Sequence, residues 1–466
     1  MNSSMPPSGK EKLTSAPASA VTVGFVSLGC SKNLVDSQHM AGVLLSEDVA
    51  LARCAEEADI VLVNTCAFIE EARQESIETI RSVCRLKTEG VCKAVLVTGC
   101  MPQRYKKDLR KLLPEVDAFL GLDELDQVGE VARRLAGGEK GILRVSNRSS
   151  ALFEPRYPAL SFTGGPYAYL KIAEGCNHPC SFCAIPSIRG RHRSRPLKSI
   201  VAEAESLLAE GFKELNIISQ DVTSYGRDLG DGTSLTRLIR NLGAIGGAFW
   251  IRLLYGYPSR VSDELLEAMG VTEQVCRYLD VPIQHSHPDI LKAMARAGTA
   301  RAVRSLPARA RKIMPDVTLR TTCLVGFPGE RESHFEHLLE YLRETQFDHV
   351  GVFAYSPEEN TRAYGMPGRP AKAVADGRRR RLMLAQKEIV DRKNAALAGL
   401  ETEVLLEYPA AGKRGAWIGR SRRHAPRVDG CVFVGGVGRD AAPGTFVRAR
   451  YTQPCDYDMK ARCISR

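Results

Sequence analysis

The chain contains 466 residues, of which 44% are hydrophobic and 26% charged, and its formal net charge is +11. This length suggests roughly three domains, no run approaches the ~18 apolar residues of a membrane span, and residues 1–20 lack the apolar block of a secretory signal. These features exclude a membrane protein and a secreted one, so we expect a cytoplasmic protein with a disordered tail over residues 1–20. Fourteen cysteines in such a protein indicate metal binding or catalysis rather than disulfides.

Residues 21–145 have the pattern of a parallel α/β domain. Apolar, β-rich runs at 21–28, 60–63 and 94–97 alternate with helix-like stretches such as 36–45 and 69–84. Alternation of this kind is typical of parallel strands that are joined by helices. The sequence therefore predicts an amino-terminal domain built on a parallel sheet.

Three cysteines of this domain, Cys30, Cys66 and Cys100, each follow one of the three apolar runs. Because the carboxyl ends of parallel strands meet at one edge of a sheet, we expect the three thiols to converge there. Three thiolates could hold an iron–sulfur cluster and leave one iron without a protein ligand. The alternative is that each is a buried structural cysteine, and the repeated position after a strand favours the cluster.

A change of composition follows at residues 146–166, which are rich in Ser, Pro and Gly and are expected to form a linker. Beyond it, six apolar runs are each followed by a stretch with helical spacing: 167–173, 215–219, 250–255, 278–283, 317–325 and 350–355. Six βα units within residues 167–398 predict an open, partial version of the (βα)8 barrel, in which chemistry gathers at the carboxyl ends of the strands.

Directly after the first of these runs, Cys176, Cys180 and Cys183 place three thiols within eight residues. A [4Fe-4S] cluster usually takes four thiolates, so a site with three leaves one iron free for another ligand. One short loop can wrap three corners of such a cluster, and we expect this segment to be a loop. The alternatives are a zinc site that adds His178 or His192, or a group of unrelated core thiols.

The spacing of these cysteines, with Phe182 before the last one, resembles the signature of radical S-adenosylmethionine (SAM) enzymes. The resemblance implies that the open iron binds SAM and that cleavage of SAM gives a 5'-deoxyadenosyl radical, which removes hydrogen from carbon. Polar residues and glycines at strand ends are further candidates for binding SAM, although each could also be a loop cap. They are Ser219, Gln220 and Asp221 after the second run, Gln284 and His285 after the fourth, and Gly326 and Glu330 after the fifth.

The last block, residues 400–466, contains five short β runs separated by turns. Five strands in so few residues suggest a small all-β barrel of the size of an OB fold, a type often used on RNA. The block resembles the TRAM domain, which implies contact with RNA or with a substrate.

Basic residues occur in three clusters, which favour a polyanionic partner such as RNA or a ribonucleoprotein over simple solvated faces. The clusters are Arg189, Arg191, His192, Arg193 and Arg195; residues 378–381; and Lys413, Arg414, Arg420, Arg422, Arg423 and Arg427.

The two cysteine triplets and the terminal barrel together resemble the methylthiotransferase family, over nearly the whole chain. The resemblance implies two [4Fe-4S] clusters, one on Cys176, Cys180 and Cys183 that makes the radical and one on Cys30, Cys66 and Cys100 that carries sulfur. It also implies two SAM molecules per turnover, an electron donor and a sulfur donor. Residues 21–145 would then be the methylthiotransferase domain, 167–398 the radical SAM domain and 400–466 the TRAM domain.

The amino-acid sequence around both triplets, at residues 29–37, 168–175 and 183–190, is similar to that of the branch of this family that modifies ribosomal protein S12. That branch implies methylthiolation of an aspartate β-carbon, with S12 met either free or in the small ribosomal subunit. The alternative is the branch that modifies adenosine in tRNA.

Overall fold

The computed structural model describes residues 21–152, 154, 162–412 and 415–465, which fall into two compact units. The first unit is the chain up to Gly164 together with Lys171–His178 and Cys183–Glu203, and the second is the remainder. The predicted tail, part of the predicted linker, and Lys413 and Arg414 of the third basic cluster lie outside the described residues. No helix in the described part of the chain is long and apolar enough to cross a membrane.

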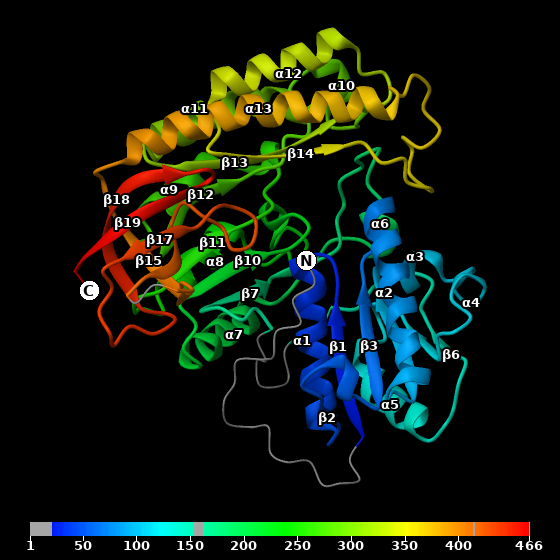
Figure 1. Ribbon diagram of the computed structural model, residues 1–466. Helices are drawn as coiled ribbons and strands as arrows, with labels where there is room; N and C mark the ends of the chain where they lie inside the picture. Colours follow the sequence, from blue (N-terminus) through cyan, green and yellow to red (C-terminus); the bar gives the residue numbers. More distant parts are fainter. Residues whose placement is uncertain (1–20, 153, 155–161, 413–414, 466) are drawn as a thin grey trace. The chain divides into compact units, whose positions relative to one another are not determined.

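The first unit is built on a six-stranded parallel sheet with the strand order β2-β1-β3-β4-β5-β6 (Figure 1), which confirms the predicted parallel α/β domain. The strands are β1 (Thr22–Ser27), β2 (Ala50–Leu51), β3 (Ile60–Thr65), β4 (Ala94–Gly99), β5 (Ala118–Leu120) and β6 (Ile142–Arg144). The central strands β3 and β4 are buried along their whole length, because helices cover both faces of the sheet. Strands β2, β5 and β6 were not predicted, since two or three residues give no periodic signal.

Alternate residues of β3 point into two separate apolar layers. Val61 and Val63 pack with Ile80 of α2 on one face, whereas Ile60 and Leu62 pack with helices α1 and α5 on the other. This period of two is what a strand buried on both faces requires. The helices that connect these strands are α1 (Ser31–Ser46), α2 (Glu70–Glu89), α3 (Cys100–Tyr105), α4 (Leu109–Leu112) and α5 (Val128–Ala136).

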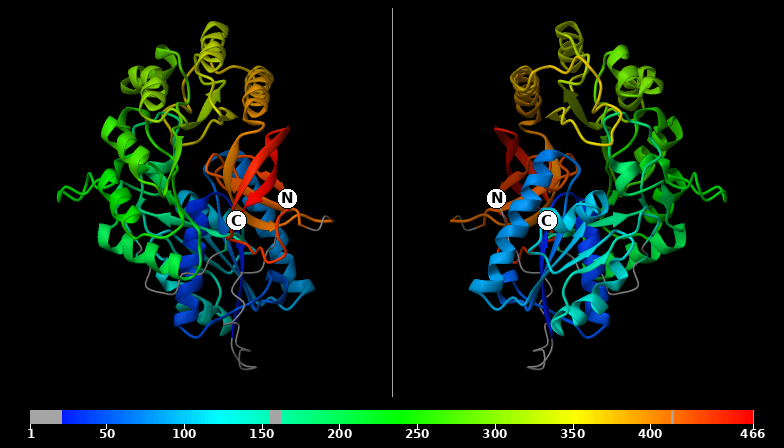
Figure 2. Two further views of the ribbon diagram at one scale, coloured as in Figure 1. Left: turned by 90° about the vertical axis from the view of Figure 1, so that its left-hand side faces the viewer. Right: turned by 90° about the vertical axis from the view of Figure 1, so that its right-hand side faces the viewer.

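The second sheet also has six parallel strands, in the order β14-β13-β12-β11-β10-β7. All six match predicted runs: β7 (Tyr167–Lys171), β10 (Glu214–Ile218), β11 (Trp250–Leu253), β12 (Val275–Asp280), β13 (Thr318–Val325) and β14 (His349–Ala354). Because β7 and β14 are unpaired edges of this sheet, the barrel is open, as predicted. Helices form an outer arc around it (Figure 2).

Each of these strands leads into a helical connection that returns the chain to the amino end of the sheet. Ser234 and Ser262 begin α8 and α9 as N-caps, accepting hydrogen bonds from the backbone N–H of Arg237 and Leu265. The helices are α6 (Ile185–Ile188), α7 (Leu197–Ala209), α8 (Leu235–Gly243), α9 (Asp263–Val271), α10 (Pro288–Ala293), α11 (Ala300–Ile313), α12 (Glu332–Thr345) and α13 (Lys372–Leu397). A small sheet of β8 (Ala173–Glu174) and β9 (Arg193–Ser194) flanks the cysteine loop.

The carboxyl-terminal strands close into a five-stranded barrel with the order β15-β16-β17-β19-β18, as the sequence predicts. In β18, Val447, Ala449 and Tyr451 are buried while Arg448 and Arg450 are exposed, so the alternation seen in the sequence separates core from solvent. The strands are β15 (Glu401–Pro409), β16 (Trp417–Ser421), β17 (Val432–Gly435), β18 (Phe446–Cys455) and β19 (Asp458–Ser465).

The small barrel packs on the amino ends of β10 and β11. Glu214, the first residue of β10, is fully buried between Arg252 of β11 (2.7 Å) and Arg420 of β16 (2.6 Å). At the start of β11, the Trp250 indole donates to a Glu403 carboxylate (3.1 Å) and packs on Phe446. The small barrel therefore leaves the carboxyl ends of the strands, where the cysteine loop lies, uncovered by these contacts.

Several residues of the basic clusters are internal and do not form a basic surface. Arg189, Arg195, Arg378 and Arg420 are buried, and each lies within 3.0 Å of a carboxylate oxygen. Their charges stabilise the fold instead of attracting a polyanion. The sequence-based interpretation of the clusters as an RNA surface is wrong for these four residues.

Candidate active site

Cys30, Cys66 and Cys100, here called the strand-end site, follow β1, β3 and β4. These strands are adjacent in the sheet, so their carboxyl ends bring the three turns together as predicted. Gly29 before Cys30 has a φ of +87°, and a Cβ there would lie 2.6 Å from the Cys66 Cβ. Only glycine fits this close approach of the first two turns.

The Asn33 side chain joins the three turns of the strand-end site. Its Nδ2 donates to the carbonyl of Leu28 (3.2 Å) after β1 and to that of Thr65 (2.7 Å) at the end of β3. Its Oδ1 accepts from the Cys100 thiol (3.7 Å) after β4. One buried amide thus fixes the spacing of turns that are far apart in sequence.

A buried cluster of four charges lies directly behind the strand-end site. Arg189 bonds Asp36 (2.9 Å) and Glu174 (3.0 Å), and Lys171 bonds the same two carboxylates at 2.5 and 2.9 Å. The remaining Arg189 contacts are Asn33 Oδ1 (2.5 Å) and Cys100 Sγ (3.7 Å). Two cations balance two anions, so Arg189 is largely neutralised where it touches the thiol.

The protonation of these groups follows from burial and from each other's charge. Although burial alone would raise the pKa of Glu174, Arg189 and Lys171 hold it well below its usual value. Burial raises the pKa of Cys100 to about 12; the Arg189 charge opposes this rise, and the thiols of Cys66 and Cys30 add to it. The mutual effect of the three thiols indicates that they are neighbours, and that their thiolates need a positive partner.

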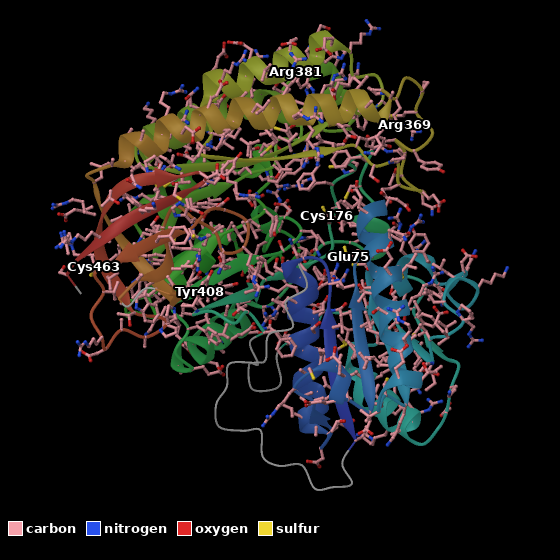
Figure 3. All side chains as sticks on the ribbon, viewed as in Figure 1. Glu75, Cys176, Arg369, Arg381, Tyr408 and Cys463 are labelled. Atoms are coloured by element: carbon pink, nitrogen blue, oxygen red, sulfur yellow. The ribbon has the colours of Figure 1, made fainter. Side chains whose placement is uncertain are left out.

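Cys176, Cys180 and Cys183, here called the loop site, lie in a segment without helix or strand, which confirms the predicted loop. The backbone N–H of Cys176 donates to the carbonyl of Gly190 (3.1 Å), and that of His178 donates to Cys176 Sγ (3.5 Å). Figure 3 labels Cys176 at this position. The first cysteine of the loop is therefore anchored to the segment that carries Arg189.

Arg296 is the cation of the loop site. Its Nη1 lies 3.5 Å from Cys180 Sγ, its Nη2 donates to the carbonyl of Pro282 (2.8 Å), and its guanidinium lies 4.3 Å from the centre of the Tyr257 ring. Arg296 is 5% exposed, and its Nε is buried without a hydrogen-bond partner among the described residues. No described carboxylate lies within 4.0 Å of it, so its charge is not offset as that of Arg189 is.

The other residues around Cys180 are held by the second unit. Ser181 donates from its N–H to Met294 O (3.0 Å) and from its hydroxyl to Ala293 O (2.9 Å). Phe182 packs beside an apolar cluster that includes Met294 and Phe327. Phe182 therefore has a packing role in this loop, whatever further contact it makes.

The two sites are connected within the first unit through two consecutive residues. Gly190 accepts a hydrogen bond from Cys176 of the loop site, and Arg189 reaches Cys100 of the strand-end site. Glu174, which bonds Arg189, comes two residues before Cys176. A short bonded path thus runs from one thiol set to the other.

The predicted SAM residues after β10 are placed differently from one another. Asp221 is used by its own turn: it accepts from the backbone N–H of Thr223 (2.9 Å) and from the hydroxyls of Thr223 and Ser224. Ser219 is fully buried and accepts from the Asp221 N–H (3.1 Å). Gln220 lies between them and is partly exposed.

After β12 and β13 the predicted residues form tight turns. Gln284 has a φ of +69° and pairs with β13 through hydrogen bonds with Thr322 (2.9 Å) and Leu324 (2.7 Å). Glu330 accepts from the Gly326 N–H (2.9 Å) and pairs with Arg378 (2.8 Å), so it closes its own turn. Buried His285 lies 3.9 Å from that carboxylate.

Sequence reasoning missed the side chains that support the thiols. Arg296 and Tyr257 stand outside any motif; Arg296 reaches Cys180 only through the fold, and Tyr257 contacts Arg296. Arg189 was noticed as part of a basic cluster, and Asn33 and Asp36 lie in the stretch 29–37. The position of Arg189 directly after the short helix α6 gave no signal that its side chain would be buried.

Three family models match separate parts of the chain. Residues 22–121 match the model of "Uncharacterized protein family UPF0004", 170–342 that of the radical SAM superfamily and 398–464 that of the TRAM domain. Among solved structures, a cobalamin- and [4Fe-4S]-bound radical SAM methyltransferase, TsrM from Kitasatospora setae, is 16% identical with a TM-score of 0.54 over 74% of this chain and 77% of its own. This likeness concerns the fold alone.

Curated relatives are much more similar. The ribosomal protein uS12 methylthiotransferase RimO of Geobacter sulfurreducens is 44% identical over 95% of this chain and 98% of its own. The enzyme of the same name from Syntrophus aciditrophicus is also 44% identical, with the same coverage, and that of Symbiobacterium thermophilum is 44% identical over 94% of this chain and 90% of its own. The chain therefore belongs to the RimO family of ribosomal protein uS12 methylthiotransferases.

Proposed function

We propose that this chain inserts a methylthio group at the β-carbon of an aspartate in ribosomal protein S12. The observation that carries the proposal is the bonded path from Cys176 through Gly190 and Arg189 to Cys100. Forming a radical and delivering sulfur must both act on one substrate carbon, and this path joins Cys176 of one thiol set to Cys100 of the other. The tRNA alternative is not favoured, because the similar curated relatives named above are all uS12 enzymes.

The enzymes of this family use [4Fe-4S] clusters and SAM, and the residues of both sites fit such clusters. Each site offers three thiols that are not in disulfides and has a guanidinium beside one sulfur. Thiolate-bound clusters carry negative charge, which these cations would offset. When bound, a reduced cluster at the loop site supplies the electron that cleaves SAM, and the cluster at the strand-end site supplies the sulfur.

The protein side chains position and shield these groups. Cys66 and Cys100 are buried whereas Cys30 is exposed, so substrate reaches the strand-end site from the side of Cys30. Asn33 fixes the separation of the three turns. Arg189, whose charge is balanced by two carboxylates, holds the net charge beside the thiols of the strand-end site constant. Arg296 contacts Cys180, and because no described carboxylate offsets its positive charge, that charge stabilises negative charge at the loop site.

For SAM we propose contacts from Gln220, Gln284 and the backbone at Gly326, with Ser219 and Phe182 as neighbours. Gly326 has a φ of +75°, and a Cβ there would meet Ala375 at 2.5 Å, so this turn depends on glycine. Asp221 and Glu330 act on the same turns by capping them. Two SAM molecules are consumed in each turnover, one as methyl donor and one as radical source.

The partners follow from this function. S12 is met free or in the small ribosomal subunit, an electron donor reduces the clusters, and a sulfur donor replaces the sulfur consumed. Residues 21–145 carry the methylthiotransferase part, 167–398 the radical part and 400–466 an RNA-contacting TRAM part, in the cytoplasm. Arg448 and Arg450 of β18 are exposed and share one carboxylate, that of Glu401, at 2.6 and 2.7 Å, so this strand of the TRAM part keeps one positive charge in excess for contact with RNA.

The substrate is tested by deleting the gene and analysing S12 peptides and digested tRNA by mass spectrometry. We expect S12 alone to lose the methylthio mass and to regain it when the wild-type gene is restored. Restoring Cys180→Ala should not regain it, whereas Cys463→Ala, which changes a cysteine at neither site, should. Loss of a methylthio adenosine from tRNA with S12 unchanged would contradict the proposal.

A further inference from the structure

Three histidines gather outside both thiol sites, on the loops that follow β12 and β13. His287 precedes α10, and its ring centre lies 4.4 Å from that of His334 and 5.0 Å from that of His337, both on α12. Asp289, in the first turn of α10, has a side chain that is 76% exposed. Ligand atoms of His287, Asp289 and His334 all lie within 4.8 Å of one another.

This set has the chemistry of a metal site. Imidazole with one carboxylate suits first-row divalent ions such as Zn²⁺. Zinc–ligand bonds of about 2.0–2.2 Å require the three atoms to close by roughly 1 Å, which rotation of the exposed Asp289 side chain allows.

One nitrogen of each of the two rings accepts a hydrogen bond from a backbone N–H. Nδ1 of His287 accepts from the Asp289 N–H at 3.2 Å, and Nδ1 of His334 accepts from the Arg331 N–H at 3.1 Å. Both distances lie at the long end of the ordinary hydrogen-bond range. Nδ1 of His287 also lies 3.9 Å from an Asp289 carboxylate oxygen, and metal binding through either ring nitrogen gives up the backbone bond that the ring now accepts.

We propose that His287, Asp289 and His334 form a site for a divalent transition ion, with Zn²⁺ as its probe and water as the remaining ligand. His337, whose Nδ1 lies 2.8 Å from the Ser286 hydroxyl, packs against His287 and fixes that ring without binding the ion. The bound ion ties the loop after β12 to the loop after β13. The site is independent of the proposed reaction.

The test uses the anaerobically reconstituted holoenzyme, so that cluster thiols are occupied, after removal of loosely bound ions. Zn²⁺ uptake is measured by equilibrium dialysis and elemental analysis, and Co²⁺ uptake by absorption. We expect one saturable ion per chain in addition to the clusters, a rise in melting temperature on binding, and Co²⁺ d–d bands without a thiolate charge-transfer band. The last result assigns the ion to nitrogen and oxygen ligands.

Asp289→Asn and His334→Gln should each weaken uptake at least about tenfold, while iron content stays at the wild-type level. Asp289→Asn changes an exposed side chain, so it tests the site even if the histidine variant folds poorly. The matched control is His39→Gln, which alters a histidine–carboxylate pair with Asp126 (2.6 Å) and should bind Zn²⁺ like wild type. No additional ion in wild type, equal uptake by Asp289→Asn, or a thiolate band with Co²⁺ overturns the proposal.

Discussion

The two cysteine sites differ in how the fold assembles their three cysteines and in how the arginine beside them is paired. The strand-end site collects Cys30, Cys66 and Cys100 from three strands, and its arginine is neutralised by Asp36 and Glu174. The loop site takes all three cysteines from one loop, and the guanidinium of its arginine contacts a carbonyl, a tyrosine ring and Cys180. The first site is thus electrically balanced and rigid, whereas the second receives an uncompensated positive charge.

This difference fits the two tasks. A site that forms a radical must accept an electron, and a nearby positive charge makes reduction easier. A site that transfers sulfur gains from fixed geometry and buried thiolates. The following predictions test whether the two arginines really differ in this way.

The largest effect concerns the thiols of the strand-end site in cluster-free protein. Because burial raises the pKa of Cys100 to about 12, roughly one part in 10⁴ of that thiol is ionised at pH 8. We expect exposed Cys30 to be alkylated by iodoacetamide at least a hundredfold faster, as measured by peptide mass spectrometry. Labelling of Cys100 should increase with pH, since only its thiolate reacts. Equal rates for both cysteines would show that the Cys100 thiol is accessible to the reagent, which would contradict the prediction.

Substitution of the balanced arginine should mainly damage stability. Arg189→Met leaves two buried carboxylates with Lys171 alone, which costs about 3–5 kcal/mol of unfolding free energy. Urea denaturation measures this loss, with exposed Arg191→Met as the control in the same segment. A loss below about 1 kcal/mol would mean that the buried charges are not held together by Arg189.

Substitution of the uncompensated arginine should instead change redox behaviour. Arg296→Met removes a charged contact with Cys180 worth about 1.5 kcal/mol, so the loop-site cluster should be harder to reduce by roughly 60 mV. Potentiometry with electron paramagnetic resonance measures this shift, and Arg296→Lys should recover part of it. Arg277→Met, which removes a guanidinium paired with Asp316 (2.8 Å), should leave the potential unchanged; an equal shift would remove the distinction between the arginines.

The smallest effect is expected at the ring beneath Arg296. Tyr257→Leu removes a cation–π contact worth about 1 kcal/mol and should shift the same potential by less than Arg296→Met. Tyr257→Phe keeps the aromatic face and should behave like wild type. If the phenylalanine variant shifts as far as the leucine variant, the ring face is not what holds the guanidinium.

The two sites also differ in how far sequence reasoning reaches. The loop site is local, so its spacing and its loop conformation were both readable from residues 176–183. The strand-end site was predicted only because each cysteine follows a strand and parallel strands share an edge. The supporting residues were not predictable: Arg296 meets Cys180 across 116 positions, and nothing in the sequence showed that Arg189 and Arg420 are buried in ion pairs.

Polar residues at strand ends have more than one use in this structure. Asp221 and Glu330 were predicted to contact SAM, yet their carboxylates bond the N–H groups of their own turns. A short side chain at a strand end can cap the backbone or bind a ligand, and sequence does not distinguish these uses. The same ambiguity is absent for clustered thiols, which have no comparable structural use.

The division of labour between the two sites is tested most directly by breaking one site at a time and measuring two products together. Reactions of reduced enzyme with SAM and S12 are analysed for 5'-deoxyadenosine and for methylthiolated S12. We predict that Cys180→Ala yields neither product, whereas Cys66→Ala still yields 5'-deoxyadenosine but no methylthiolated S12. Methylthiolation of S12 by Cys66→Ala at the wild-type level would contradict the account.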